Sequence, residues 1–262
     1  SDFAGSSIVH SAGGWAALMG AVFLGPRIGK YGPDGKPRAI PGHNVGFAVV
    51  GVFVLWFGWF GFNAGSELAM DNWVAHCIMT TLLAGSAGVV GAGAAIWRKT
   101  GAMDVGMAGN GALAGLVSIT AGTGTMSFAG SVAVGFIGGV IVVYSVLFIE
   151  RRGIDDPVGA VSVHGVCGAW GTLAIGFFAR HDDAFLGRDD AGLFYGGGFD
   201  QLLVQAIGVV IVAVWVLGTT AILFKVLKST VGLRVSAEEE LAGLDVAEHG
   251  SPGYGPEPVL VG

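Results

Sequence analysis

The sequence has few charged residues for its length. Of its 262 residues only 12% are charged, whereas 53% are hydrophobic, and the mean hydropathy is +0.70. About a quarter of the residues in a water-soluble domain are charged, so this chain lacks the polar surface of a soluble protein. We therefore expect an integral membrane protein. The sequence also lacks a basic cluster of the kind that binds nucleic acid, so no such partner is expected.

Cysteine is scarce as well, and motifs of enzymatic chemistry are missing. The two cysteines, Cys77 and Cys167, both lie in apolar runs, where cysteine is usually a small buried hydrophobic residue. Their number and spacing predict neither a disulfide framework nor a metal site. Since the sequence contains no nucleophile–base pair, metal cluster or phosphate-binding loop, we expect no enzyme and no cofactor.

Glycine and long apolar runs are abundant instead. The 48 glycines favour close approach of membrane helices. The apolar runs are long enough for a hydrocarbon core of about 30 Å, and their continuity favours helices over barrel strands. We predict an all-α polytopic helical bundle in residues 1–229, followed by a polar tail in residues 230–262, where Ser236 and Glu239 predict a short capped helix. The expected spans are residues 3–25, 44–65, 73–97, 105–121, 127–149, 157–179 and 199–227, of which 105–121 is the shortest.

The lysine and arginine residues are distributed unevenly among the connections between these spans. Eleven of the 13 lie in the first, third and fifth connections or at and beyond the end of the last apolar run, where Lys225 falls in its final turn. The second and fourth connections contain none, and the sixth contains Arg180 and Arg188 among aspartates. Because cytoplasmic loops are enriched in lysine and arginine, we predict a cytoplasmic tail and an external residue 1, in the cell membrane.

One pattern occurs twice, in DFAGSSIVHSAGG (residues 2–14) and DPVGAVSVHGVCG (residues 156–168). Both copies read D-x-x-G-x-x-x-V-H-x-x-x-G, and they open the first and sixth expected spans, which cross the membrane in opposite directions. Such a pair indicates an inverted repeat with a substrate site near the membrane midplane. At a rise of about 1.5 Å per residue, His10 and His164 reach similar depths from opposite faces, and we predict that their imidazoles touch.

A histidine pair in an apolar path suits a substrate that can give up a proton. Ionisable residues inside spans usually line a functional path, although a lone histidine such as His76 is more simply bonded to a backbone carbonyl. Burial favours neutral rings, which can bind or share a proton. Ammonium can lose a proton and cross as ammonia, whereas potassium would face the full cost of desolvation. We therefore expect selection by acidity.

An aromatic segment, LWFGWFGFNAGS, ends the second expected span on its outer side. At Trp56, Phe57 and Trp59 the simplest interpretation is an interfacial aromatic belt. Phe62 and Ser66 are four residues apart and share one helical face, so a ring and a hydroxyl there can hold a small cation.

Aspartates precede both histidines at the same spacing. Asp156 is followed by Pro157, which predicts a helix N-cap with proline at the first helical position. Asp2 is expected to be a similar cap, and its charge would also favour capture of a cation at the outer face.

These segments together are similar to the Amt family of the ammonium transporter/Rh superfamily. The resemblance covers nearly the whole chain and is clearest in DFAGSSIVH, GWFGFNAGS, NGALAGLVSITAG, DDPVGAVSVHGVCGAWGTLAIGFFA and TVGLRVSAEEELAGLDVAEHG. It implies eleven spans in two inverted halves, of which this chain matches the last seven, and a homotrimer with one pore per subunit. We accordingly expect the chain to begin partway through a longer protein.

The resemblance also implies functions for individual residues. His10 and His164 resemble the twin pore histidines, Phe62 a phenylalanine of the outer gate, Ser66 a hydroxyl of the external recruitment site, and Asp2 the aspartate that supports this site. We therefore predict transport of ammonium or ammonia by a protein surrounded by membrane lipid. The cytoplasmic face of family members docks PII-type signalling proteins, which makes such a protein a candidate partner. The alternative function is an ammonium sensor that signals through its tail.

Overall fold

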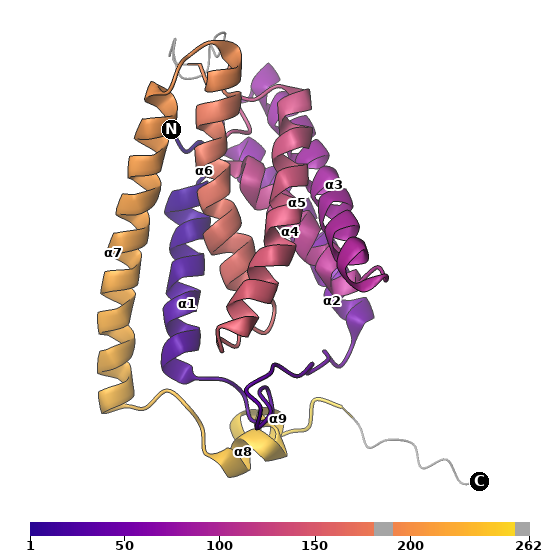
Figure 1. Cartoon of the computed structure of the whole chain (residues 1–262), viewed down its shortest axis with the longest axis vertical. Helices are drawn as coiled ribbons and strands as arrows, with labels where there is room; N and C mark the ends of the chain where they lie inside the picture. The colour runs from indigo at the N-terminus through magenta and orange to yellow at the C-terminus, as the bar shows by residue number, and fades with distance from the viewer. Residues whose placement is uncertain (181–190, 255–262) are drawn as a thin grey trace, which may run out of the picture.

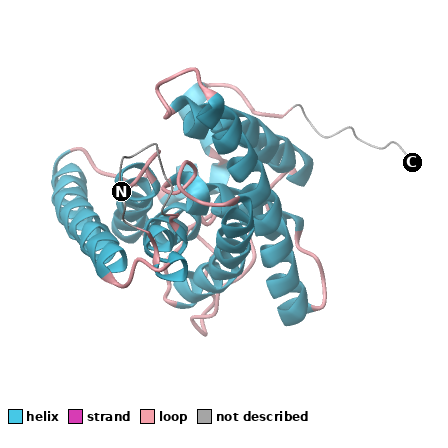
Figure 2. Cartoon of the chain, turned by 90° about the horizontal axis from the view of Figure 1, so that it is seen from above, coloured by secondary structure: helices cyan, strands magenta, loops and turns pink. Residues whose placement is uncertain are grey.

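A computed structural model describes residues 1–180 and 191–254, and in this part of the chain it contains helices and loops but no strand (Figure 1). Figure 2 shows the same bundle from above, with the long helices seen close to end-on. The elements are η1 (Ser6–Ser11), α1 (Ala12–Leu24), α2 (Val45–Gly65), α3 (Asn72–Thr100), α4 (Val105–Thr120), α5 (Phe128–Arg151), η2 (Val161–Val166), α6 (Cys167–Phe178), η3 (Leu193–Tyr195), α7 (Asp200–Thr230), α8 (Ala237–Ala242) and α9 (Leu244–His249). The predicted all-α class is confirmed. Part of the sixth connection, including Arg188, lies outside the described residues.

Among the described residues, six helical segments are long and apolar enough to cross a membrane. They are Ser6–Leu24, Val45–Gly65, Asn72–Thr100, Phe128–Arg151, Val161–Phe178 and Asp200–Thr230. A further apolar helix, α4, has 16 residues, which corresponds to about 24 Å of helix against a core of about 30 Å. It falls on the predicted run 105–121, the shortest of those expected from the sequence.

Short polar side chains mark where several helices begin. An oxygen of the residue before the helix accepts a hydrogen bond from a backbone N–H of the first turn, which satisfies one of the donors that a helix start leaves unpaired. This is the case at Asn44 before α2, Asp71 before α3, Asp104 before α4 and Ser127 before α5. Ser236 and Glu239 form the predicted capping box at α8.

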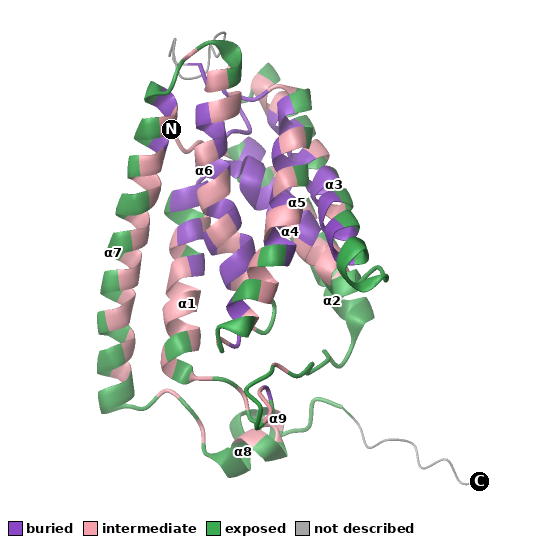
Figure 3. Ribbon diagram, viewed as in Figure 1, coloured by how far each residue is buried: buried purple, intermediate pink, exposed green. Residues whose placement is uncertain are grey.

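The interior lies between α3, α4 and α5, which cross at glycines. A methyl group at Gly88 would overlap the carbonyl of Gly111 in α4, and one at Gly139 in α5 would overlap the carbonyl of Gly88. Backbone therefore packs on backbone, as is typical of membrane helices. α7 is at the periphery, where it packs against α1 and α6 and is largely exposed or half-buried (Figure 3).

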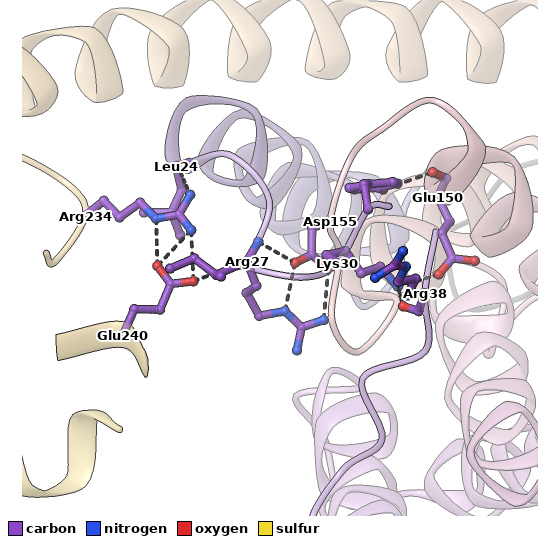
Figure 4. A network of polar contacts seen from close by, with 10 residues as sticks. Leu24, Arg27, Lys30, Arg38, Glu150, Asp155, Arg234 and Glu240 are labelled. Atoms are coloured by element: carbon purple, nitrogen blue, oxygen red, sulfur yellow. Dashed lines mark hydrogen bonds and ion pairs between the residues drawn. The ribbon is translucent and has the colours of Figure 1, made fainter. Parts of the chain in front are cut away.

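Three segments meet below the bundle as it is drawn in Figure 1: the connection between α1 and α2, the connection between α5 and η2, and the tail. Arg27 in the first donates from Nε and Nη2 to the carboxylate of Asp155 in the second, at 2.7 and 2.9 Å. Glu240 of the tail accepts from the backbone N–H of Ile28 at 2.8 Å and from Arg234. Figure 4 shows this network. The segments predicted to be cytoplasmic thus contact one another at one end of the molecule.

Candidate functional site

The two copies of the repeated pattern have the same local structure. Asp2 accepts hydrogen bonds from the backbone N–H groups of Ser7 and Ile8 at 3.0 and 2.9 Å. Asp156 accepts from those of Ala160 and Val161 at 2.9 and 2.8 Å. Both carboxylates therefore accept from first-turn N–H groups, but the N-cap residues are Gly5 and Ala160. Pro157 lies in a turn before the helix, so the predicted N-cap at Asp156 with proline at the first helical position is wrong.

The glycine three residues after each aspartate has a left-handed backbone. Gly5 has φ of 107° and Gly159 has φ of 76°, a region that glycine enters without steric cost. After each glycine the chain forms a π-helix, η1 or η2, before it continues as an α-helix. His10 lies in the first π-helix and His164 in the second. Such short π-helical segments occur frequently at functional sites.

Small residues bring the two copies together. The hydroxyl of Ser11 donates to the carbonyl of Gly165 at 2.9 Å. A methyl group at Gly14 would overlap the backbone of Gly165, and one at Gly168 would overlap the carbonyl of Ser6. The copies therefore cross backbone against backbone, which places the histidines on either side of the crossing within reach of each other.

The two imidazoles are in contact, as predicted. Nδ1 of His10 lies 3.2 Å from Nδ1 of His164, the ring centroids are 5.2 Å apart, and the rings are inclined by 24°. One nitrogen donates and the other accepts, since a neutral imidazole has one of each. Nε2 of His10 is buried and has no hydrogen-bond partner among the described residues. The pair can therefore exchange a proton internally while this nitrogen stays available.

Two aromatic side chains of α2 cover His10. The Trp59 ring is stacked on it, with centroids 4.8 Å apart and an inclination of 17°, and the Phe62 ring lies 5.3 Å away at 43°. Trp59 is only 6% exposed, so its interpretation as an interfacial belt residue is wrong. Phe57 is 79% exposed and remains consistent with a belt. In the sequence, Trp59 and Phe62 are three residues apart and therefore share one helical face. This spacing was the signal that could have predicted a common partner for the two rings.

Phe62 and Ser66 lie at the end of α2 and are linked to each other. The Ser66 hydroxyl donates its proton to the carbonyl of Phe62 at 2.8 Å. Only the lone pairs of its oxygen are then available to another ligand. The Phe62 ring is 38% exposed while it also faces His10. The structure therefore connects the predicted outer residues to the histidine pair through one aromatic ring.

The environments of His76, Cys77 and Cys167 are those of residues with a structural role. Nε2 of His76 is 3.0 Å from the carbonyl of Met126, and its ring stacks on Phe128, which fits the carbonyl-bonded role expected of it. The side chains of Cys77 and Cys167 are buried, and the described residues contain no group of side chains that could hold a metal ion.

The whole arrangement has counterparts among known proteins. The chain matches the model of the Ammonium Transporter Family over residues 1–254. It is 49% identical to ammonium transporter Amt2 of Archaeoglobus fulgidus over 97% of this chain and 55% of that protein. A solved structure named Sensor Amt Protein is 41% identical, with a TM-score of 0.87 over 94% of this chain and 60% of that one. The crystal structure of Candida albicans Mep2 is 32% identical, with a TM-score of 0.80 over 91% of this chain and 53% of that one. The chain spans little more than half the length of these proteins.

Proposed function

The chain belongs to the ammonium transporter family, and from this premise we propose that it conducts ammonium or ammonia across a membrane past His10 and His164. The family and the apolar helices establish an integral membrane protein. The family also agrees with the prediction that the chain is not an enzyme. The observation that carries the proposal is the Nδ1 to Nδ1 contact of 3.2 Å at the crossing of two inverted copies.

The proposed path begins at the outer end of α2. Ammonium is attracted by the Phe62 ring through its π-electrons and by a lone pair of Ser66, while Asp2 supports the recruitment through its hydrogen bonds to the start of η1 and as a negative charge. The cation then gives up one proton to the histidine pair, ammonia continues as a neutral molecule past the rings, and the pair releases the proton on the inner side, so that one charge crosses with each ammonia. A neutral species crosses the apolar interior without the large desolvation cost of a cation, which is why potassium would be excluded.

The histidine pair is proposed to handle the proton and to orient the substrate. An imidazole nitrogen without a partner accepts a hydrogen bond from an N–H of the substrate. The neighbouring ring can stabilise either tautomer because the Nδ1 atoms share one proton. Two rings therefore adapt to a donor or an acceptor without any movement of the helices.

The same proposal includes the assembly and its surroundings. We infer a homotrimer in the cell membrane, embedded in lipid, with residue 1 outside and the tail in the cytoplasm. The lysine and arginine residues of the connections support this orientation. A PII-type signalling protein is the proposed partner of the cytoplasmic face.

The test is the current evoked by ammonium in proteoliposomes that contain the full-length protein. We expect a saturable current that potassium does not evoke, and we expect His10→Ala or His164→Ala to abolish it or to admit potassium. Selective flux that is unchanged in both variants would overturn the pore role. If no current flows, alkalinisation of the vesicle interior distinguishes electroneutral ammonia flux from no transport.

An ammonium sensor is the second candidate, favoured by the similarity to the structure named Sensor Amt Protein. A sensor would bind ammonium at the same outer residues and transmit the signal through the tail. Ammonium binding without current and without a change in internal pH, together with an ammonium-dependent change in protease cleavage of the tail, would favour this function over transport.

A further inference from the structure

The end of α4 contacts both elements that surround the His10 ring. The hydroxyl of Thr120 accepts a hydrogen bond from Nε1 of Trp59 at 3.0 Å, and the carbonyl of Thr120 accepts from the backbone N–H of Ala4 at 3.1 Å. The next residue, Ala121, donates from its backbone N–H to the hydroxyl of Ser6 at 2.7 Å. One turn of α4 therefore holds the indole on one side and the start of η1 on the other.

The His10 ring itself has few directional contacts. Its hydrogen bond to His164 leaves Nε2 without a partner among the described residues, so one bond alone does not fix the plane of the ring. The nearly parallel Trp59 ring supplies the missing restraint, since stacking at 4.8 Å and 17° permits only small rotations. The Trp59 ring is in turn fixed at its edge by Thr120.

We propose that Trp59 and Thr120 are positioning residues that hold the His10 imidazole in the orientation in which its Nδ1 meets that of His164. The orientation is inferred from geometry alone, whereas its effect on transport rests on the proposed function. When the indole is released, His10 can turn away from His164, and the shared proton between the two Nδ1 atoms is lost. The pore then discriminates less well between ammonium and potassium.

Two substitutions separate the hydroxyl from the ring. Thr120→Val removes the acceptor at nearly constant volume, and Trp59→Phe keeps an aromatic face but removes the N–H donor. Thr80→Val is the matched control. Thr80 and Thr120 are both fully buried, and each hydroxyl also donates to the carbonyl four residues earlier in its own helix. The Thr80 hydroxyl pairs with Thr123 instead of an indole.

The first readout is the ¹⁵N spectrum of labelled histidine in the full-length protein in lipid, which reports the tautomer of each ring. We expect the wild type to show two different tautomers at His10 and His164, joined by one shared proton. Thr120→Val and Trp59→Phe should mix the tautomers, while Thr80→Val should leave the spectrum unchanged. The second readout is the ratio of potassium flux to ammonium flux, which we expect to rise about tenfold in Thr120→Val, the scale of one lost hydrogen bond.

The outcomes distinguish this inference from the proposed function. Unchanged histidine spectra in both variants overturn the positioning role, and so does an equal change in Thr80→Val, which would mean a general loosening of the core. A changed spectrum in a protein whose wild type carries neither ammonium nor ammonia supports the positioning role and refutes the proposed transport. If Thr120→Val does not fold, Trp59→Phe decides by the same spectrum.

Discussion

At the residue scale, Asp155 shows how one carboxylate joins two connections. Its side chain is 3% exposed and accepts three hydrogen bonds from Arg27, two from the guanidinium and one from the backbone. Burial by itself would raise the pKa of the Asp155 carboxyl, but the hydrogen bonds and the charge of Arg27 outweigh it, and the pKa is lowered. The ionised form is therefore the one that stabilises the folded chain.

The pH dependence follows from that direction. A lowered pKa in the folded state means that the stabilisation is complete above the carboxyl's ordinary pKa of about 4 and is lost as the pH falls through the lower folded value. We expect Asp155→Asn to reduce the free energy of unfolding by about 1 kcal/mol at pH 7, a small value because the Arg27 side chain is 39% exposed and screened by solvent.

Unfolding in detergent at several pH values measures this difference. The gap between wild type and Asp155→Asn should be constant from pH 7 to pH 5 and should close only under more acidic conditions. Asp34→Asn is the control. The Asp34 side chain is 58% exposed and its ion pair with Lys36 is long, at 3.7 Å, so this substitution should leave the free energy of unfolding nearly unchanged. A gap that already closes near pH 6 would contradict the assignment.

Sequence reasoning found His10 and His164 but missed Trp59, and both results have a physical cause. Histidine is uncommon inside the apolar runs of this chain, so its recurrence in register after an aspartate reveals a pair. Spans that cross in opposite directions then bring residues of similar depth together. Tryptophan at the end of a span is ordinary, and only tertiary packing decides whether its ring meets lipid or a buried imidazole. Thr120, which fixes that ring, is an unremarkable threonine near the end of an apolar run.

At the scale of elements, the close crossing of η1–α1 and η2–α6 sets the distance between the histidines. Gly13 and Gly14 are adjacent in α1 but differ in surroundings. A methyl group at Gly14 would overlap the backbone of Gly165, whereas one at Gly13 meets no heavy atom of the described residues within 4 Å. Only one of these two glycines is therefore required by packing.

We expect Gly14→Ala to lower the free energy of unfolding by about 1–3 kcal/mol, as overpacking does, and to separate the imidazoles. Gly13→Ala should be neutral or slightly stabilising, because alanine favours a helix over glycine. Thermal unfolding in detergent and ammonium flux in vesicles measure the two effects. Equal behaviour of the two variants would contradict a backbone contact between the copies.

The helices could be predicted from the sequence better than their first turns. Continuous apolar runs indicate the long helices, and Ser236 with Glu239 predicts the capped start of α8. The π-helices were not predicted, because they depend on hydrogen bonds to the fifth residue back, such as the one from His10 to the carbonyl of Gly5 at 3.0 Å. Hydrophobic periodicity does not report such a bond.

At the scale of the whole molecule, the tail is attached to the end of α1, the helix that continues from His10. The Arg234 guanidinium donates to the carbonyl of Leu24 at 3.3 Å and to Glu240, which in turn accepts from the backbone of Ile28. These bonds are exposed and confined to one end. They are therefore suited to influence the rate of a process in the bundle without altering its interior.

We expect removal of residues 236–262 to change the size or regulation of the ammonium flux while potassium stays excluded. Glu240→Gln should act in the same direction with a smaller effect, because it weakens the bonds to Arg234 and Ile28. Glu238→Gln serves as the control, since Glu238 lies in the same helix with an exposed side chain and, unlike Glu240, contacts neither Arg234 nor Ile28. Complete loss of trimers from the shortened protein in detergent would contradict this division of roles.

The close backbone contact between the two copies limits how they can move relative to each other. Many inverted-repeat transporters alternate access by rocking one repeat against the other, which requires side chains that can slide. Here the two backbones touch at Gly14 and Gly165, so the two copies cannot slide past each other. Any displacement of the crossing therefore moves both imidazoles together. Under the proposed function, we therefore expect a stationary pathway whose throughput is set by side-chain rotation and diffusion rather than by a conformational cycle.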